Sequence, residues 1–168
     1  MGLLLFILCC THTLSAQQTG GTTDDDYIAY IEQYKEIVLQ QEDEYGIPAA
    51  ITMAQALLES SAGKSELAIN ANNHFGIKCT SDWRWETYNH DDDAANECFR
   101  KYYEPEDSFI DHSLFLKNRK RYAPLFELGK KDYKGWARTL RQCGYATDPK
   151  YPQKLIDIIE RYNLNRLR

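Results

Sequence analysis

Hydrophobic positions recur at helical spacing along most of the chain and lose that spacing only in one stretch near its middle. In residues 24–45 the apolar side chains share one helical face: Ile28, Ile31, Tyr34, Val38 and Tyr45. This spacing predicts an amphipathic helix that buries that face. Three aspartates at its start suit the positive end of the helix dipole, and Gly46 ends it.

The next stretch, residues 47–59, is predicted to form a buried helix. Pro48 suits the first helical position, because the N–H that proline lacks has no partner there. The apolar stripe is wide, with members at spacings of three and four and others beside them: Ile51, Met53, Ala54, Leu57 and Leu58. A helix that is apolar on so much of its surface belongs in the core.

One carboxylic acid, Glu59, stands at the end of this apolar helix. It follows Leu57 and Leu58 directly, so its surroundings disfavour a charge. The negative end of the helix dipole acts in the same direction. Both effects favour the protonated form, and a carboxylic acid that stays neutral near physiological pH is what general acid catalysis requires.

The later elements are predicted from the same spacing and from its interruption. Residues 60–63 form a turn, and the helical period fades between residues 76 and 103, where aromatic and β-branched residues indicate short strands. Helical segments are expected at residues 64–69, 108–118, 119–128 (interrupted by Pro124), 132–143 and 154–162. Ser108 is the expected cap of its helix. The sequence therefore predicts a mainly α (α+β) protein.

Three motifs carry a resemblance to a known family. They are AQALLES at residues 54–60, NNHFGIK at residues 72–78, and GYATDP at residues 144–149 followed by Tyr151. In this order the motifs resemble those of glycoside hydrolase family 73, the peptidoglycan N-acetylglucosaminidases found in autolysins and in a flagellar rod-building protein. The resemblance covers residues 27–168. It implies a lysozyme-like helical domain with a small β-lobe, and hydrolysis of β-1,4 bonds in the cell-wall glycan.

The resemblance also implies roles for particular residues. It makes Glu59 the catalytic acid, and it suggests substrate-binding residues along the cleft: Gln55, Asn73, Phe75, Tyr145 and Asp148. Tyr145 would face the scissile sugar, and Asp148 would shape its loop. Where the family usually has glycine and an aromatic residue, this chain has Ser61 and Ala62, which changes one wall of the expected cleft.

The sequence identifies the second catalytic carboxylate of such an enzyme less clearly than the first. Five acids crowd the region of the predicted strands: Glu86, Asp91, Asp92, Asp93 and Glu97. By position Glu86 matches the family's β-lobe glutamate, and Asp91 to Asp93 compete with it. Glu86 and Asp91 are therefore candidate catalytic residues beside Glu59. The run is also compatible with a solvated hairpin tip or a weak calcium site, and the substrate's own 2-acetamido group is an alternative nucleophile.

Two cysteines, Cys79 and Cys98, bracket the expected β-lobe. A disulfide between them would close a loop of about 20 residues and stabilise the fold by roughly 3 kcal/mol. The alternatives are two buried thiols or a zinc site completed by His74 or His90, although the spacing is not that of a zinc knuckle. Cys143 is expected to be a buried free thiol, and His112 a core or rim histidine rather than a catalytic one. No metal and no cofactor is expected.

Composition and the first residues limit the kinds of partner, the number of domains and the cellular location. The net charge of −5 disfavours a nucleic-acid partner, and 43% hydrophobic with 27% charged residues is ordinary for one globular domain. Residues 1–16 resemble a signal peptide, residues 17–26 a flexible tether, and residues 27–168 the domain itself. Cys9 and Cys10 leave lipid attachment as an alternative. We expect an exported monomer without a membrane span, acting in the periplasm or outside the cell.

The sequence therefore predicts a secreted N-acetylglucosaminidase that cuts peptidoglycan strands internally. Two alternatives remain open at this point. A lytic transglycosylase would use the same single glutamate, but that family usually follows Glu-Ser with Gly-Leu-Met-Gln, which is absent here. A catalytically silent glycan-binding module is the other, and it would be favoured if the cleft held no acid shielded from water.

Overall fold

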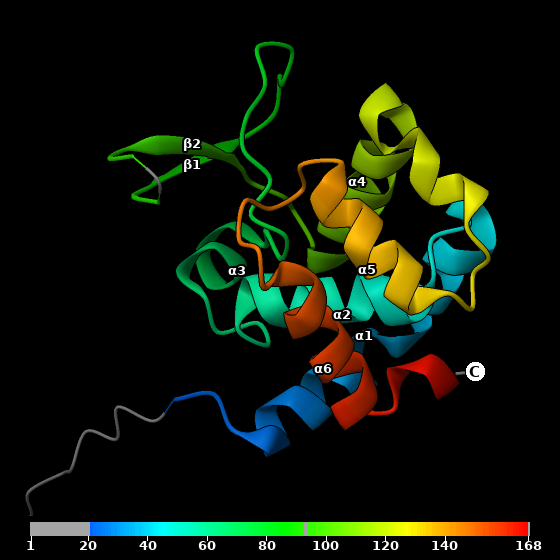
Figure 1. Ribbon diagram of the computed structural model, residues 1–168. Coiled ribbons are helices and arrows are strands. Elements are labelled where there is room, and N and C mark those ends of the chain that lie inside the picture. Colours follow the sequence, from blue (N-terminus) through cyan, green and yellow to red (C-terminus); the bar gives the residue numbers. More distant parts are fainter. Residues whose placement is uncertain (1–20, 93, 168) are drawn as a thin grey trace, which may run out of the picture.

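Helix α2 (Ala49–Ser60) runs through the middle of the protein, and the other helices pack around it (Figure 1). The structure, a computed structural model, describes residues 21–92 and 94–167. Every residue from Ala49 to Leu57 is buried. This confirms the wide apolar stripe, because a helix that is apolar on all sides must be covered on all sides.

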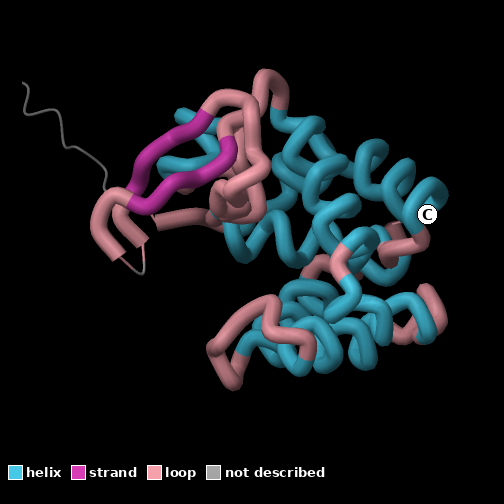
Figure 2. The backbone as a smooth tube through the Cα atoms, turned by 90° about the horizontal axis from the view of Figure 1, so that it is seen from above, coloured by secondary structure: helices cyan, strands magenta, loops and turns pink. Residues whose placement is uncertain are grey.

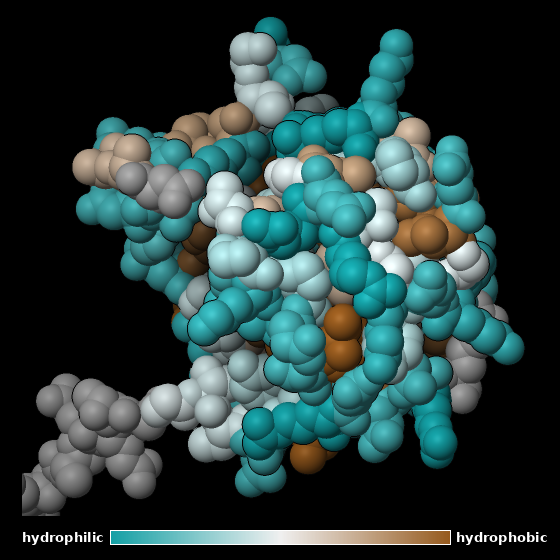
Figure 3. Space-filling model, in the orientation of Figure 1, coloured by the Kyte–Doolittle hydropathy of each residue, from teal (hydrophilic) through white to brown (hydrophobic). Residues whose placement is uncertain are grey.

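The surrounding elements follow in chain order and make a mainly helical fold, as predicted. They are α1 (Asp24–Tyr45), α3 (Glu66–Ala71), α4 (Pro105–Asn118), the 3₁₀ segment η1 (Lys120–Glu127), α5 (Tyr133–Gln142), α6 (Tyr151–Arg161) and the 3₁₀ segment η2 (Leu164–Arg166). The core lies between α2 and these elements, with Trp136, Tyr122 and Phe109 as its largest wholly buried side chains. The face drawn in Figure 3 is mostly hydrophilic, with apolar residues in small separate spots.

A small β-lobe projects to one side of the helices (Figure 2). Strands β1 (Thr87–His90) and β2 (Glu97–Arg100) pair antiparallel, with Thr87 opposite Arg100 and His90 opposite Glu97. A single bridge between Lys78 and Phe99 extends the pairing toward the helices. The expected β-lobe is therefore present and contains one hairpin.

The disulfide prediction is confirmed. Cys79 and Cys98 are bridged, with their Cα atoms 5.4 Å apart, so the alternatives of free thiols and of zinc bound by these cysteines are wrong. A two-stranded hairpin is marginal by itself in water, and the covalent link from Cys79 to strand β2 compensates for its small core. Cys143 is free, as predicted, but it is half-buried rather than buried.

Several predicted details need correction. Ile28 is 51% exposed, so it does not belong to the buried face of α1. Helix α1 begins at Asp24, as predicted, where the Thr23 hydroxyl accepts a hydrogen bond from the Asp26 N–H, so residues 24–26, which the predicted tether also included, are helical. Pro48 is the N-cap of α2 rather than its first residue.

Two later helices start earlier than predicted, and a proline explains both. Helix α4 begins at Pro105 rather than Ser108, with Glu104 and Asp107 forming a reciprocal capping box. Helix α6 begins at Tyr151 rather than Lys154, and Pro152 lies in its first turn. Proline in a first turn loses no hydrogen bond, so both residues start helices.

His112 lies in the core, as predicted, and supports the chain that lines the site described below. Its side chain is wholly buried, and its ring stacks on Phe75 with 4.0 Å between ring centroids. Burial lowers the pKa of His112 to about 3, so the ring is neutral at physiological pH.

The predicted signal peptide, Cys9, Cys10 and residues 17–20 of the tether lie outside the described residues. Within the described part of the chain, no helix has the length and apolar character needed to cross a membrane.

We predict that replacing both Cys79 and Cys98 with serine lowers the free energy of unfolding by about 3 kcal/mol, because the open chain regains the entropy of a loop of about 20 residues. Urea unfolding followed by circular dichroism measures this change. Cys143→Ser is the matched control, since Cys143 forms no disulfide. An unfolding free energy equal to that of the wild type would mean that the bridge does not stabilise the β-lobe.

Candidate active site

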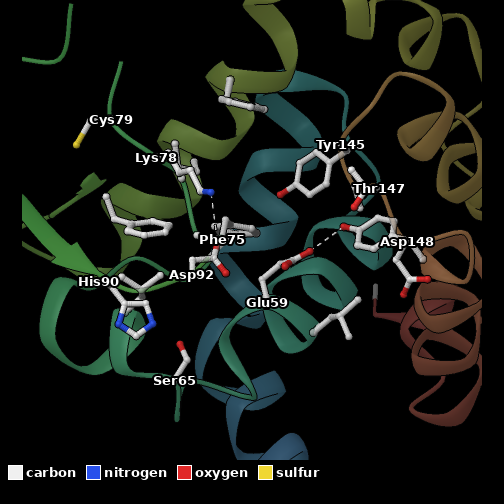
Figure 4. Close-up of a pocket in the computed structure, with 18 of the residues that line it drawn as sticks. Glu59, Ser65, Phe75, Lys78, Cys79, His90, Asp92, Tyr145, Thr147 and Asp148 are labelled. Carbon is white, nitrogen blue, oxygen red and sulfur yellow. Dashed lines mark hydrogen bonds and ion pairs between the residues drawn. The ribbon is translucent and has the colours of Figure 1, made fainter. Parts of the chain in front are cut away.

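A cleft of about 830 Å³ lies between the helical body and the β-lobe. Several parts of the chain line it, among them the end of α2 at Glu59, residues 75–80, the β-lobe residues His90, Asp92 and Phe99, the loop 145–148, and residues of η1 and α6. Figure 4 shows Glu59 near the centre of this cleft, with Tyr145 and Asp92 on opposite sides. Sequence segments that are almost 90 residues apart therefore meet around one carboxyl group.

Glu59 occupies the last turn of α2, where its side chain leaves the core and enters the cleft. Solvent reaches it through the cleft, but the cleft walls displace much of the surrounding water. This desolvation raises the pKa of Glu59, and the nearby Asp92 carboxylate adds to the rise. A hydrogen bond from Tyr151 and the charge of Lys154 act in the opposite direction without cancelling it. The net effect favours the protonated acid, as the sequence suggested.

A buried relay of hydrogen bonds holds Glu59. The Tyr151 hydroxyl donates to Glu59 Oε1 over 3.0 Å and accepts from Gln55 Nε2 over 3.0 Å. Gln55 and Glu59 lie four residues apart on α2, so their side chains project from the same face toward α6. Gln55 is wholly buried, and its Oε1 has no hydrogen-bond partner among the described residues. Gln55 therefore lies behind Tyr151 and is not part of the cleft wall, contrary to the expectation of a direct substrate contact.

Asn73 and Phe75 set the floor of the cleft in different ways. Asn73 is buried, donates through Nδ2 to the carbonyls of Ile77 and Arg100, and accepts from the Ile77 N–H. Its amide therefore fixes the turn at residues 73–77 to strand β2, and it does not line the cleft as expected. Phe75 does line the cleft, and it rests on His112.

The loop between α5 and α6 supplies the wall opposite the β-lobe. Gly144 has a φ of 76°, a left-handed conformation that glycine adopts without strain, and Tyr145 follows it into the cleft. Burial raises the pKa of Tyr145 well above its ordinary value, so its hydroxyl keeps its proton. Asp148 also lines the cleft and forms an ion pair with Lys154 over 2.7 Å, which lowers the pKa of Asp148.

Of the β-lobe acids that the structure describes, Asp92 is the one that lines the cleft, and Asp93 lies outside the described residues. It forms an ion pair with Lys78 over 3.3 Å and faces the side of the cleft that holds Glu59 (Figure 4). Glu86 lies outside this cleft and pairs with Lys101 over 2.9 Å. Asp91 is exposed, and its Oδ1 accepts from the Asn96 N–H. Neither Glu86 nor Asp91 meets Glu59, so their expected positions need correction.

The reason lies in the path of the hairpin. Glu86 precedes β1 at the base of the lobe, whereas Asp92 follows β1 and turns back over the cleft. Sequence reasoning left Asp91, Asp92 and Asp93 undivided, because neighbouring aspartates in a turn give no signal about which one faces inward.

Sequence reasoning assigned no role to several residues that line the cleft. These are Lys78, Arg119, Arg121, Tyr151 and Lys154. Tyr151 lies two residues after the third motif, and Lys154 lies one turn further along α6, so helical spacing could have placed them together. Among the described residues, no group of three or more His, Cys, Asp or Glu side chains is arranged to hold a metal ion.

A carboxyl with a raised pKa at the end of a buried helix, facing a small β-lobe across a cleft, is the arrangement expected of a glycoside hydrolase domain of the lysozyme-like type. Comparison with known families agrees. The family model described as mannosyl-glycoprotein endo-beta-N-acetylglucosaminidase matches residues 35–164. The chain therefore belongs to this glucosaminidase family, as its three motifs indicated.

Curated relatives and solved structures lie in the same family. The chain is 35% identical to exo-glucosaminidase LytG of Bacillus subtilis over 178 residues, which cover 97% of this chain and 61% of the relative. It is 30% identical to the peptidoglycan hydrolase FlgJ of Vibrio parahaemolyticus, over 67% of this chain and 40% of that one. The chain thus spans less than two thirds of either relative.

Among solved structures, the chain is similar to a peptidoglycan hydrolase from Sphingomonas sp. A1, with a TM-score of 0.72 and 30% identity over 83% of this chain and 91% of that one. It is also similar to the catalytic domain of the Listeria monocytogenes autolysin Auto, with a TM-score of 0.72 and 26% identity over 89% and 92%. These similarities extend over the whole helical body, so the predicted lysozyme-like domain with a small β-lobe is confirmed.

We predict that Tyr151→Phe moves the alkaline limb of the pH–rate profile to higher pH. The hydrogen bond from Tyr151 lowers the pKa of Glu59, so its removal raises that pKa further and keeps the acid protonated to a higher pH. Measuring kcat/KM against pH on a soluble glycan fragment reports this limb in the free enzyme.

Tyr133→Phe is the matched control, because the Tyr133 hydroxyl donates to Glu160 on the protein surface. A limb that stays in place or moves to lower pH in Tyr151→Phe would show that this hydroxyl does not tune Glu59.

Proposed function

We propose that this protein hydrolyses β-1,4 glycosidic bonds of peptidoglycan at N-acetylglucosamine. The observation that carries the proposal is Glu59, a carboxyl group whose pKa is raised inside a cleft of about 830 Å³. Such an acid can donate a proton to a leaving oxygen at a pH where an ordinary glutamate is ionised. The names of the relatives, exo-glucosaminidase and peptidoglycan hydrolase, support the same reaction and substrate.

In the proposed reaction Glu59 protonates the glycosidic oxygen while the sugar approaches an oxocarbenium-like state. Tyr151 and Gln55 fix the direction of the Glu59 carboxyl through the relay of hydrogen bonds. Tyr145 offers a protonated hydroxyl to the sugar from the opposite wall. Phe75 forms an apolar part of the floor, which strengthens the desolvation of the acid.

We propose Asp92 as the second carboxylate, in place of Glu86 or Asp91. Its contact with Lys78 fixes it on the β-lobe side of the cleft, across from the acid. In that position it would activate a water molecule or stabilise the positive charge that develops on the sugar. Attack by the substrate's 2-acetamido group remains the alternative, and it needs no second carboxylate.

The silent glycan-binding alternative is less well supported, because the cleft holds both an acid with a raised pKa and a second carboxylate. A lytic transglycosylase differs from a hydrolase in its product, a 1,6-anhydro sugar. The relative LytG is named as an exo-acting enzyme, whereas we propose cleavage within the strand. The lengths of the released products distinguish these two modes of cleavage. The disulfide and the substrate together support action outside the cytoplasm.

We predict that Glu59→Gln lowers the rate of peptidoglycan cleavage by at least ~10²–10⁴-fold, which is the usual contribution of a positioned proton transfer. Glutamine keeps the shape and the acceptor for Tyr151 but has no acidic proton. Mass spectrometry of muropeptides released from purified sacculi measures the rate, and the reducing-end sugar identifies the bond that is cut.

The fold is expected to survive this change, because the site already disfavours a charge. Glu36→Gln, on the exposed face of α1, is the matched control and should keep full activity. If Glu59→Gln melted like the wild type and still digested sacculi at a near-normal rate, Glu59 would not be the acid.

We predict that Asp92→Asn lowers the cleavage rate by ~10²-fold or more, whereas Glu86→Gln and Asp91→Asn change it less than about threefold. The reason is that Asp92 lines the cleft and the other two do not. Rates on sacculi for the three variants, prepared in parallel, give the comparison. Full activity of Asp92→Asn would favour attack by the substrate's 2-acetamido group. A large loss of activity in Glu86→Gln alone would identify Glu86, and not Asp92, as the second catalytic carboxylate.

A further inference from the structure

A second hollow, of about 700 Å³, lies apart from the cleft, between the base of the β-lobe and the outer face of α4. Four of the six large apolar side chains that are exposed in the described part of the chain line it: Trp85, Tyr103, Ile110 and Leu114. Trp85 is 71% exposed and Tyr103 is 88% exposed. Scattered apolar residues are normal on a protein surface, but a cluster around one concavity indicates a binding site.

The aromatic part of this hollow is held rigidly. The Trp83 indole donates its Nε1–H to the Glu86 carbonyl over 2.9 Å, and the Arg100 guanidinium lies 4.4 Å from its ring centroid. Arg100 in turn binds the Asp111 carboxylate on α4 over 2.9 Å. Trp85 packs on Trp83, with their ring centroids 4.8 Å apart. A surface that is already fixed loses little conformational entropy when it binds a ligand.

Polar groups surround the exposed rings. Glu86 and Lys101 form an ion pair at one edge, and Asp107 and Asn72 lie at the other side of the hollow. This combination suits a pyranose ring, whose C–H face is apolar enough to stack on an indole while its hydroxyl and amide groups form hydrogen bonds at the rim. Binding sites that combine an apolar surface with a few polar groups orient small ligands in this way.

The size and charge of the hollow argue against other occupants. Eleven residues line it, whereas a stable protein interface takes about 20–30 residues from each side. Lys101 pairs with Glu86, Arg100 pairs with Asp111, and Asp107 adds a further acid, so the hollow offers no excess positive charge to attract an anionic membrane surface. A segment of one or two sugar rings fits both constraints.

We propose that this aromatic hollow, centred on Trp85, is a second binding site for the peptidoglycan glycan. The inference rests on the proposed function, which supplies a polymeric substrate long enough to engage two sites. A weak second site raises the local concentration of strand near the cleft without a change in the chemistry there. Its effect should therefore appear on polymer and vanish on fragments that occupy the cleft alone.

The test separates binding from cleavage. In the Glu59→Gln background, which removes cleavage, binding to purified sacculi is measured by pelleting, with and without Trp85→Ala. We expect Trp85→Ala to weaken binding about tenfold, the scale of one good aromatic contact. In the wild-type background, Trp85→Ala should slow the release of muropeptides from sacculi and leave kcat/KM on a tetrasaccharide of the same glycan unchanged.

Ile28→Ala is the control, because Ile28 is also exposed but lies on α1, outside the hollow. Equal sacculus binding with and without Trp85→Ala would overturn the proposal, and so would an equal loss of rate on sacculi and tetrasaccharide. If the wild type bound sacculi through Trp85 but released no fragments, the proposed reaction would fail while the glycan site stood.

Discussion

The structure depends on one constraint: an ionisable group stands at the end of a helix that is buried on every side. Residues 49–57 of α2 are buried, and Glu59 two residues later opens into the cleft. Its carboxyl accepts a hydrogen bond from the Tyr151 hydroxyl. Because Tyr151 begins α6, the position of that helix against α2 sets both the direction and the proton affinity of the acid.

The β-lobe is stabilised differently from the helical body, because a hairpin of eight strand residues cannot bury a core of its own. Covalent and polar links replace that core. The Cys79–Cys98 bridge closes the loop, Asn73 fixes the adjoining turn to β2, and Arg100 ties β2 to α4 through Asp111. The lobe is thereby fixed at its base, and its tip brings Asp92 over the cleft.

Much of the helical body could be predicted from the sequence, because a period of three to four residues reports burial directly. The acid at the end of α2 and the disulfide could be predicted as well, the first from its apolar neighbours and the second from its place at the base of the lobe. Gln55 and Asn73 could not be assigned correctly, since a motif marks a residue without saying whether it touches the ligand or supports another side chain. Both turned out to be buried supports.

The assignment of the lobe's acids could not be predicted for a related reason. Glu86 matches the family's β-lobe glutamate by its place in the chain, but its distance from the cleft depends on how the hairpin folds back, which no local pattern records. In this structure Glu86 pairs with Lys101 and lines the aromatic hollow, while Asp92 of the same lobe lines the cleft. The two acids are six residues apart, and each lines a different hollow of one disulfide-closed loop. The proposed contact of one long strand at two points follows from this arrangement, because one lobe presents Asp92 to the cleft and Trp85 to the hollow.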